Sequence, residues 1–165
     1  MINTKLLVSL AMLTSILLLG QIALAPLPNI EIVSLLIILY TLLLGKYVYY
    51  IIYGFAVLEG LVYGFGLWWF MYLYVWTILA IITMIFRKNR SPVFWAIVSG
   101  LFGLSFGFLC SFPYFITGGI GGGVAFFLSG IPFDITHSIG NVIVALILFQ
   151  PLYSILKRFL PGTES

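Results

Sequence analysis

SGIPFDITHSIGNVIVALILFQPLY, residues 129–153, has the length and apolar character of a membrane-spanning helix, yet its first half carries an acid, an imidazole and an amide. At about 100° of rotation per residue, Asp134, His137, Ser138 and Asn141 fall within about 100° of arc on such a helix. A charged side chain near mid-bilayer costs at least about 2.5 kcal/mol on insertion scales. The polar face of this helix therefore has to point at something other than hydrocarbon.

The composition of the whole chain indicates that its solvent is a bilayer. Apolar residues make up 63% of the chain and charged residues 7%, and the mean hydropathy is +1.25. A water-soluble globular domain cannot present such a composition to its solvent. Because 165 residues have room for about six spans of roughly 20 residues, we expect an all-α membrane protein with a single integral membrane domain over residues 1–165.

Apolar runs separated by polar, Gly or Pro interruptions predict six transmembrane helices in one bundle. The clearest interruptions are APLPN at 25–29, RKNRSP at 87–92 and TGGIGGG at 117–123. The last of these we expect to be a flexible external connection. The predicted spans lie near residues 5–25, 30–45, 47–67, 68–87, 92–116 and 125–156.

The basic residues predict an orientation in the cell membrane. Positively charged short loops resist translocation, so they stay in the cytoplasm. With a cytoplasmic N terminus and alternating sides, every basic residue falls on the cytoplasmic side, and both termini are cytoplasmic. Because these residues are scattered between apolar runs, they do not predict a nucleic-acid partner. They are Lys5, Lys46, Arg87, Lys88, Arg90, Lys157 and Arg158.

The first span also imitates a secretory signal, since Lys5 precedes an apolar core that ends in Ala23-Leu24-Ala25. The apolar stretch is long for a signal, and a proline would follow the cut. We therefore expect these residues to remain as a helix.

Small residues recur at helical spacing in the third and fifth spans. Helices in lipid associate through close backbone approach at such residues, so intramolecular packing is the favoured interpretation, and the single Cys110 is interpreted as packing too. The small residues are Gly60 and Gly64 in the third span and Ser99, Gly103, Gly107 and Ser111 in the fifth.

Ala11 and Ser15 have the same four-residue spacing in the first span. Such pairs are common in membrane helices and support close packing within a bundle. They also fit a docking face for another membrane protein, and the spacing alone leaves both interpretations open.

A second intramembrane acid, Glu59, lies in the third span with Tyr63 one turn later. In the fourth span, Trp69, Tyr72 and Trp76 follow i, i+3, i+7 spacing. With a rise of about 1.5 Å per residue, Glu59 lies roughly 12 Å, and Asp134 to His137 roughly 13–18 Å, inside the outer ends of their spans. An aromatic wall and an acidic patch are therefore expected in the same outer half of the membrane. The candidate binding residues are Glu59, Tyr63, Trp69, Tyr72, Trp76, Asp134, His137 and Asn141.

Two interpretations account for these polar groups. The acids and His137 could satisfy one another in a dry network, or a carboxyl could be protonated. Alternatively, they line a water-accessible cavity that opens to the outside and binds a small molecule. Trp68 and Trp69 could equally be interfacial anchors.

Other chemistries have less support in the sequence. One histidine with two acids, without HExxH or a cysteine pair, does not predict a metal site. The TGGIGGG stretch lacks the lysine and the following Ser or Thr of a phosphate-binding loop. No nucleophile accompanies His137, so we expect neither an enzyme nor a bound cofactor.

The stretch SGIPFDITHSIGNVIVALILFQPLYSILKR, six short spans and the Ala11–Ser15 pair resemble the substrate-binding S component of energy-coupling factor (ECF) transporters. The architecture matches over essentially the whole chain, and PFD-x-x-H-x-x-GN at 132–141 is the more specific signal. The resemblance implies a subunit that captures a vitamin or related micronutrient from outside. It would work with a membrane scaffold, the T component, and two ATPase subunits.

The resemblance also assigns roles within the chain. The family's small-xxx-small motif on the first helix meets the scaffold, and here it would be Ala11 and Ser15, with serine in place of the usual second alanine. The subunit would tip within the membrane to turn its site inward. Metal-binding members carry a histidine near an extracellular amino terminus, which MINTKLL lacks, so cobalt and nickel are not expected.

The identity of the ligand is left open by the sequence. Two acids beside an aromatic wall favour a flat molecule that carries an amine or a positive charge, although an Asp–His pair would also suit a neutral ligand. The alternative functions are a self-sufficient small permease or channel, and a membrane scaffold or intramembrane enzyme.

Overall fold

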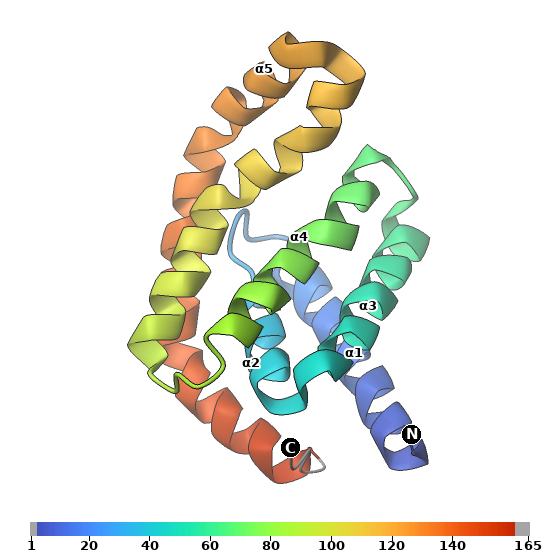
Figure 1. Ribbon diagram of the computed structural model, residues 1–165, viewed down its shortest axis with the longest axis vertical. Helices are drawn as coiled ribbons and strands as arrows, with labels where there is room; N and C mark the ends of the chain where they lie inside the picture. The colour runs from blue at the N-terminus through green and yellow to red at the C-terminus, as the bar shows by residue number, and fades with distance from the viewer. Residues whose placement is uncertain (1–2, 161–165) are drawn as a thin grey trace.

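The computed structural model describes residues 3–160, and all regular structure in that range is helical, as the composition predicts. The predicted domain of residues 1–165 also includes residues 1–2 and 161–165, which lie outside the described part. The elements are α1 (Thr4–Leu24), α2 (Val33–Leu44), the short 3-10 turn η1 (Gly45–Tyr47), α3 (Val48–Tyr63), α4 (Leu67–Ile85) and α5 (Pro92–Phe159) (Figure 1).

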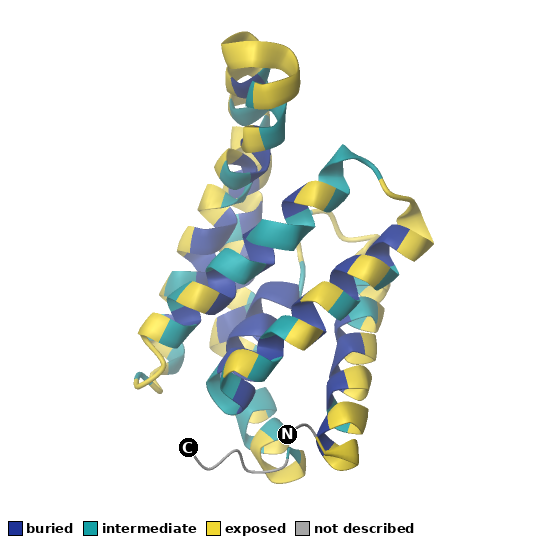
Figure 2. Ribbon diagram, turned by 45° about the vertical axis from the view of Figure 1, so that its right-hand side comes forward, coloured by how far each residue is buried: buried dark blue, intermediate teal, exposed yellow. Residues whose placement is uncertain are grey.

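Several helical stretches are suited to a bilayer. Among the described residues, four are long and apolar enough to cross one: Thr4–Leu24, Val33–Tyr63, Leu67–Ile85 and Pro92–Phe159. Their outer faces are exposed (Figure 2) and carry large apolar side chains such as Leu19, Ile85 and Ile147. Such a surface is compatible with lipid and not with water.

The chain reverses direction inside α5. Gly119, with φ 64° and ψ −167°, is the non-helical residue at which two helices join. Residues 92–118 form the outgoing arm and residues 120–159 the returning arm of a long hairpin (Figure 1). The flexible connection predicted over 117–123 is therefore wrong in extent, since one glycine with a positive φ makes the turn and its neighbours stay helical.

Small residues let the two arms of α5 approach closely. A Cβ at Gly103 would lie 3.1 Å from the backbone of His137 and Ser138, and a Cβ at Gly107 would overlap the carboxylate of Asp134. Ser99, Gly103, Gly107 and Ser111 are all buried, which confirms that this stripe is a packing surface. The Gly60–Gly64 pair differs, because Gly64, with φ 87°, terminates α3 and does not belong to a packed face.

Helix α2 is the centre of the bundle. Its sequence, VSLLIILYTLLL, is apolar on every side, which is typical of a helix surrounded by other helices. Ten of its twelve residues are buried, and it contacts α1, α3, α4 and α5. At about 1.5 Å per residue, α2 alone is about 18 Å long and shorter than a typical hydrocarbon layer of about 30 Å. The number of membrane crossings therefore stays a prediction.

The described ends of the chain lie at the same end of the bundle (Figure 1). The turn between α2 and α3 and the connection between α4 and α5 lie there as well. All seven basic residues belong to these segments or to the adjoining helix ends. The α1–α2 connection and the reversal at Gly119 lie toward the opposite end.

Candidate ligand-binding cavity

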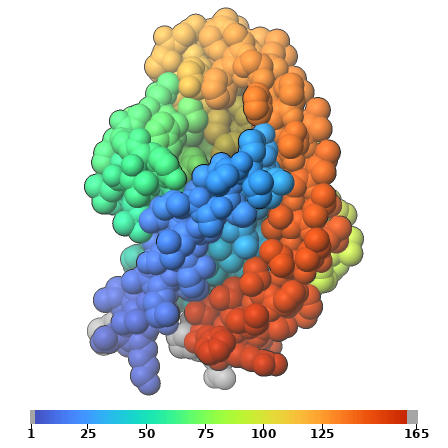
Figure 3. Space-filling model, turned by 180° about the vertical axis from the view of Figure 1, so that it is seen from behind, coloured from blue at the N-terminus to red at the C-terminus, as the bar shows by residue number. Residues whose placement is uncertain are grey.

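A cavity of about 540 Å³ opens in the half of the bundle away from the basic residues. Its size falls within the range of about 300–1,000 Å³ that is usual for small-molecule sites. Figure 3 shows the hollow from behind, between the α1–α2 connection in blue, the α3–α4 region in green and the upper part of α5 in orange. Its lining includes Gln21, Asn29, Glu31, Trp68, Met71, Tyr72, Trp76, Phe106, Cys110, Phe126, Ser129, Phe133, Asp134 and His137.

Asp134 lines this cavity and has one carboxylate oxygen without a hydrogen-bond partner among the described residues. The residue is 5% exposed, and its Oδ1 accepts a hydrogen bond of 2.9 Å from the backbone N–H of Gly107 on the outgoing arm. Oδ2 has no hydrogen-bond partner among the described residues. An unpaired buried acceptor is costly, so the Asp134 carboxyl is the lining group best suited to receive a hydrogen-bond donor.

His137 is paired with a residue far away in the sequence. Its Nε2 lies 3.2 Å from Oε1 of Glu31, in the connection between α1 and α2. The other oxygen of Glu31 accepts a hydrogen bond of 2.8 Å from the backbone N–H of Ser34 in the first turn of α2. Glu31 therefore joins the α1–α2 connection to the returning arm of α5 at the wall of the cavity.

Opposing influences act on the Glu31 carboxyl. Burial raises its pKa, whereas the charge and hydrogen bond of His137 and the hydrogen bonds of Ser34 lower it. The net effect holds the pKa of Glu31 below its usual value. The carboxylate is therefore the favoured form in the folded protein.

Aromatic rings form one side of the cavity. Tyr72 makes edge contacts with Trp68 and Trp76, at centroid distances of 5.2 Å and 5.5 Å. Trp76 also lies 5.6 Å from Phe106, and Phe106 lies 5.1 Å from the His137 ring. Such a wall suits a flat ring, which can stack or make edge contacts with it.

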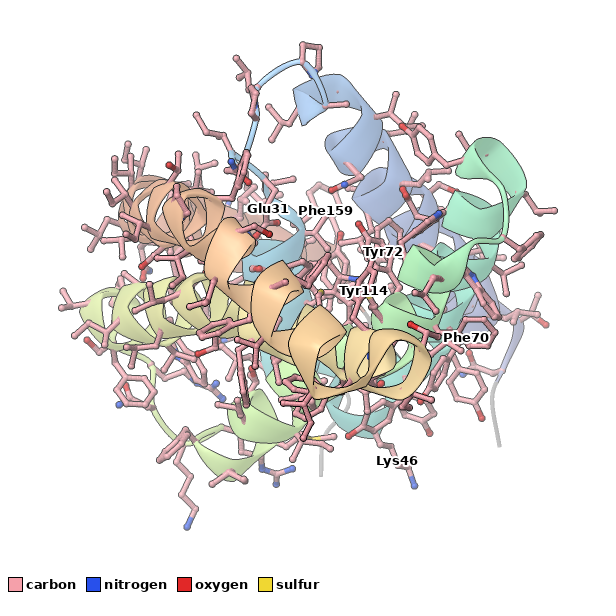
Figure 4. All side chains as sticks on the ribbon, turned by 90° about the horizontal axis from the view of Figure 1, so that it is seen from above. Glu31, Lys46, Phe70, Tyr72, Tyr114 and Phe159 are labelled. Carbon is pink, nitrogen blue, oxygen red and sulfur yellow. The ribbon has the colours of Figure 1, made fainter. Side chains whose placement is uncertain are left out.

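The same wall contains an unused hydrogen-bond donor. Trp76 is 2% exposed, and its Nε1 has no partner among the described residues. Two residues of the lining thus carry an unpaired polar atom, an acceptor on Asp134 and a donor on Trp76. In Figure 4, Glu31 and Tyr72 come from different sides and lie within the ring of helices.

Four of the eight candidate residues, namely Tyr72, Trp76, Asp134 and His137, line the cavity. Glu59, Tyr63, Trp69 and Asn141 do not. Glu59 is buried on α3, while Tyr63 is 52% exposed at the end of that helix. The Nε1 of Trp69 donates a hydrogen bond of 2.8 Å to the carbonyl of Ala56 on α3.

Asn141 lies one turn beyond His137 and holds helices together instead of lining the cavity. Its Nδ2 donates to Ser34 Oγ at 3.3 Å and to the carbonyl oxygen of Ser99 at 3.2 Å. It thereby joins α2 to both arms of α5. Of the four residues in the polar stripe of the last span, Asp134 and His137 thus line the cavity and Asn141 bridges helices, while Ser138 does neither.

The sequence reasoning missed two residues at the cavity. Glu31 was not among the candidate residues, although a lone acid at the start of the second span could have been considered as a partner for the polar stripe of the last span. Trp68 replaces Trp69, since Trp68, Tyr72 and Trp76 at i, i+4, i+8 share the cavity face, whereas Trp69 faces α3.

The described residues contain no group of three His, Cys, Asp or Glu side chains that could hold a metal ion. Ala11 and Ser15 are both exposed on α1. Ser15 Oγ donates to the carbonyl of Ala11 at 3.0 Å, so the serine's hydroxyl is satisfied within its own helix. The two side chains at this position are consequently small, and the helix surface that they present is mostly apolar.

Comparisons with protein-family models, with curated proteins and with solved structures find no match to this chain.

Proposed function

We propose that the protein is a membrane-embedded binding subunit that captures a small molecule in the 540 Å³ cavity. The observation that carries the proposal is that Asp134, a lining residue of an aromatic cavity, has a carboxylate oxygen without a partner among the described residues. A dry structural seam would leave this acceptor without compensation, whereas a ligand with a donor group supplies it. Glu31 and His137 already satisfy each other and serve as a preorganised wall.

The ligand we infer is a flat ring system with two polar features. An amine, amidine or ring N–H group would donate to Asp134 Oδ2, and a carbonyl or ring nitrogen would accept from Trp76 Nε1. Tyr72, Trp68 and Phe106 would enclose the ring through aromatic contacts. A positive charge on the donor would strengthen its bond to the carboxylate.

The arrangement proposed for the cell is that of the S component of an ECF importer. Its six spans would place the basic end of the bundle in the cytoplasm by the positive-inside rule, and the cavity would open to the outside. A membrane scaffold would dock on α1 at Ala11 and Ser15, and two ATPases would supply the energy for uptake. The exposure of Ala11 and Ser15 on α1 supports this face as the docking site.

The binding experiment starts with mass spectrometry of the small molecule retained by protein purified in mild detergent. The affinity of Asp134→Asn for that molecule is then compared with that of the wild-type protein by calorimetry. We expect a loss of at least tenfold, because a bond to a charged acceptor contributes about 1.5–3 kcal/mol. Glu59→Gln is the matched control, since that carboxyl lies outside the lining. Equal binding by Asp134→Asn and the wild type would remove the proposed site.

Co-purification separates the importer subunit from a self-sufficient permease. An S component is expected to retain a scaffold and ATPases when isolated from its native membrane, and Ala11→Trp or Ser15→Trp should release them without reducing ligand binding. Transport by the chain reconstituted alone in liposomes would favour the permease instead.

A further inference from the structure

A second hollow, of about 470 Å³, lies at the opposite end of the bundle from the ligand cavity. Its wall combines three basic side chains with apolar residues from the end of α2, from η1 and from the end of α4. They are Thr41, Leu42, Leu43, Leu44, Gly45, Lys46, Tyr47, Met84, Arg87 and Arg90.

The three basic residues that line this hollow come from separate segments. Lys46 lies in η1, where Gly45, with φ 56°, reverses the chain between α2 and α3. Arg87 follows α4, and Arg90 lies in the connection to α5. The fold therefore brings together charges that the sequence separates by about forty residues.

No acidic side chain balances these charges within the described range. The acids between residues 3 and 160 are Glu31, Glu59 and Asp134, none of which lines this hollow. The ion pair found in that range joins Glu31 to His137 at the other cavity. Three basic residues around one hollow, without an acid of residues 3–160 in its wall, attract an anion.

One cation is held in place by an aromatic ring. The Arg90 guanidinium carbon lies 5.7 Å from the centroid of Tyr153 on the returning arm of α5. A cation–π contact of this kind leaves guanidinium N–H groups available to an anionic oxygen. Arg90 is thus oriented by an aromatic ring, and no acid of residues 3–160 forms an ion pair with it.

We propose that this hollow binds the phosphate of an anionic phospholipid headgroup. The apolar part of the wall, Leu42, Leu44 and Met84, offers a surface for the first acyl carbons next to the charges. Basic pockets between membrane helices at the cytoplasmic side are suited to such headgroups. Ile85 follows Met84 in the chain, and the ring of Tyr50 stacks on that of Tyr47 at 6.5 Å. Both residues are exposed, by 68% and 59%.

A lipid is favoured over free phosphate because apolar and cationic surfaces adjoin at this hollow. Inorganic phosphate would use the three cations alone, whereas a phospholipid uses both surfaces. The site is independent of the ligand cavity, since none of the residues that line one hollow lines the other.

The test compares phosphatidylglycerol with phosphatidylcholine of identical acyl chains. Each lipid is titrated into the purified full chain in neutral detergent, and native mass spectrometry gives the bound fraction. The triple variant Lys46→Gln/Arg87→Gln/Arg90→Gln is compared with Lys5→Gln/Lys88→Gln/Arg158→Gln. The second variant loses the same charge at the same end of the bundle, but its residues lie outside the hollow.

We expect the wild-type protein and the control variant to prefer phosphatidylglycerol, and the triple variant to lose that preference. Each charge removed from the hollow should weaken the preference roughly fivefold. If the triple variant does not fold, the single variants Lys46→Gln and Arg90→Gln give graded values. Circular dichroism checks the helicity of each variant. Equal loss in the control variant, or no preference in the wild type, would overturn the site. If excess inorganic phosphate competes for the hollow as effectively as phosphatidylglycerol does, the lipid would be overturned as its occupant.

Discussion

Glu31 and His137, separated by 106 positions in the chain, meet at 3.2 Å and connect the start of the central helix to the returning arm of α5. Because Ser34 N–H binds the other oxygen of Glu31, the carboxylate also caps the first turn of α2. One side chain therefore fixes the position of two helices beside the cavity.

The Glu31 carboxyl gives the fold a dependence on acid pH. Its pKa is lowered in the folded protein, so the carboxylate stabilises the fold fully above the ordinary value of 4.5. That contribution is lost as the pH falls through the lowered value. Glu31→Gln should reduce the free energy of unfolding by roughly 1–3 kcal/mol at neutral pH. Thermal unfolding in detergent at a series of pH values should show the difference from wild type shrinking below about pH 4.5. A constant difference across this range would contradict the assignment.

Gly107→Ala should damage both packing and the cavity. The added methyl group would overlap the Asp134 carboxylate, so the carboxylate must move away from the N–H of residue 107. We expect a loss of about 1–3 kcal/mol in unfolding free energy together with weaker ligand binding. Gly118→Ala is the control, because a Cβ there meets nothing within 4 Å. A melting temperature for Gly107→Ala equal to that of Gly118→Ala would argue against the close approach of the arms.

Gly119→Ala should destabilise the reversal of α5. The φ of 64° and ψ of −167° at this residue belong to a region that side chains other than glycine rarely adopt, at a cost of about 1–3 kcal/mol. Gly121→Ala tests the same chemical change two residues later, in open space and at helical backbone angles. Differential scanning fluorimetry should therefore separate the two variants, and equal melting temperatures would show that Gly119 does not make the turn.

Asn141→Ala should cost about 1–2 kcal/mol, because it removes the hydrogen bonds to Ser34 and Ser99. Ser99→Ala provides the contrast. Its hydroxyl has no partner among the described residues, and the carbonyl that Asn141 uses is retained, so we expect a change within about 0.5 kcal/mol. Chemical unfolding in mixed micelles gives both values. A larger loss for Ser99→Ala would mean that its hydroxyl makes a bond that the structure lacks.

Cysteine labelling tests the proposed orientation. On a Cys110→Ala background, a cysteine at Ile116, which is 86% exposed, should react with a membrane-impermeant maleimide in intact cells. A cysteine at Lys88, at the basic end, should react only after the membrane is opened. Labelling of both positions in intact cells, or the reverse pattern, would rule out the cytoplasmic placement of the basic end.

Local pattern predicted the helices well because apolar runs and their interruptions depend only on neighbouring residues. The predicted span of residues 68–87 corresponds to α4 (Leu67–Ile85), and the span of residues 92–116 nearly matches the outgoing arm of α5. The glycine-rich run of residues 117–123 led to the wrong prediction of a flexible connection, because glycine is common both in loops and at a single-residue reversal such as Gly119.

The cavity was harder to predict because it depends on which helix faces meet. The rotation of α4 decides that Trp68 lines the cavity and that Trp69 reaches Ala56, and the two adjacent tryptophans carry no local signal that distinguishes them. The separation of Glu59 from the cavity likewise depends on the packing of α3. Spacing along one helix could group Asp134 with His137, but it could not supply Glu31 from the other side.

The single-residue turn at Gly119 has a consequence for the evolution and engineering of this hairpin. Both arms remain helical up to that residue. The number of residues in each arm therefore determines which side chains of the two arms face each other. Inserting one residue between Gly119 and Asp134 would rotate the residues on one side of the insertion by about 100° relative to those on the other and shift them about 1.5 Å. Apart from Gly119 itself, the tip, although remote from the cavity, should therefore tolerate changes of residue type far better than changes of length.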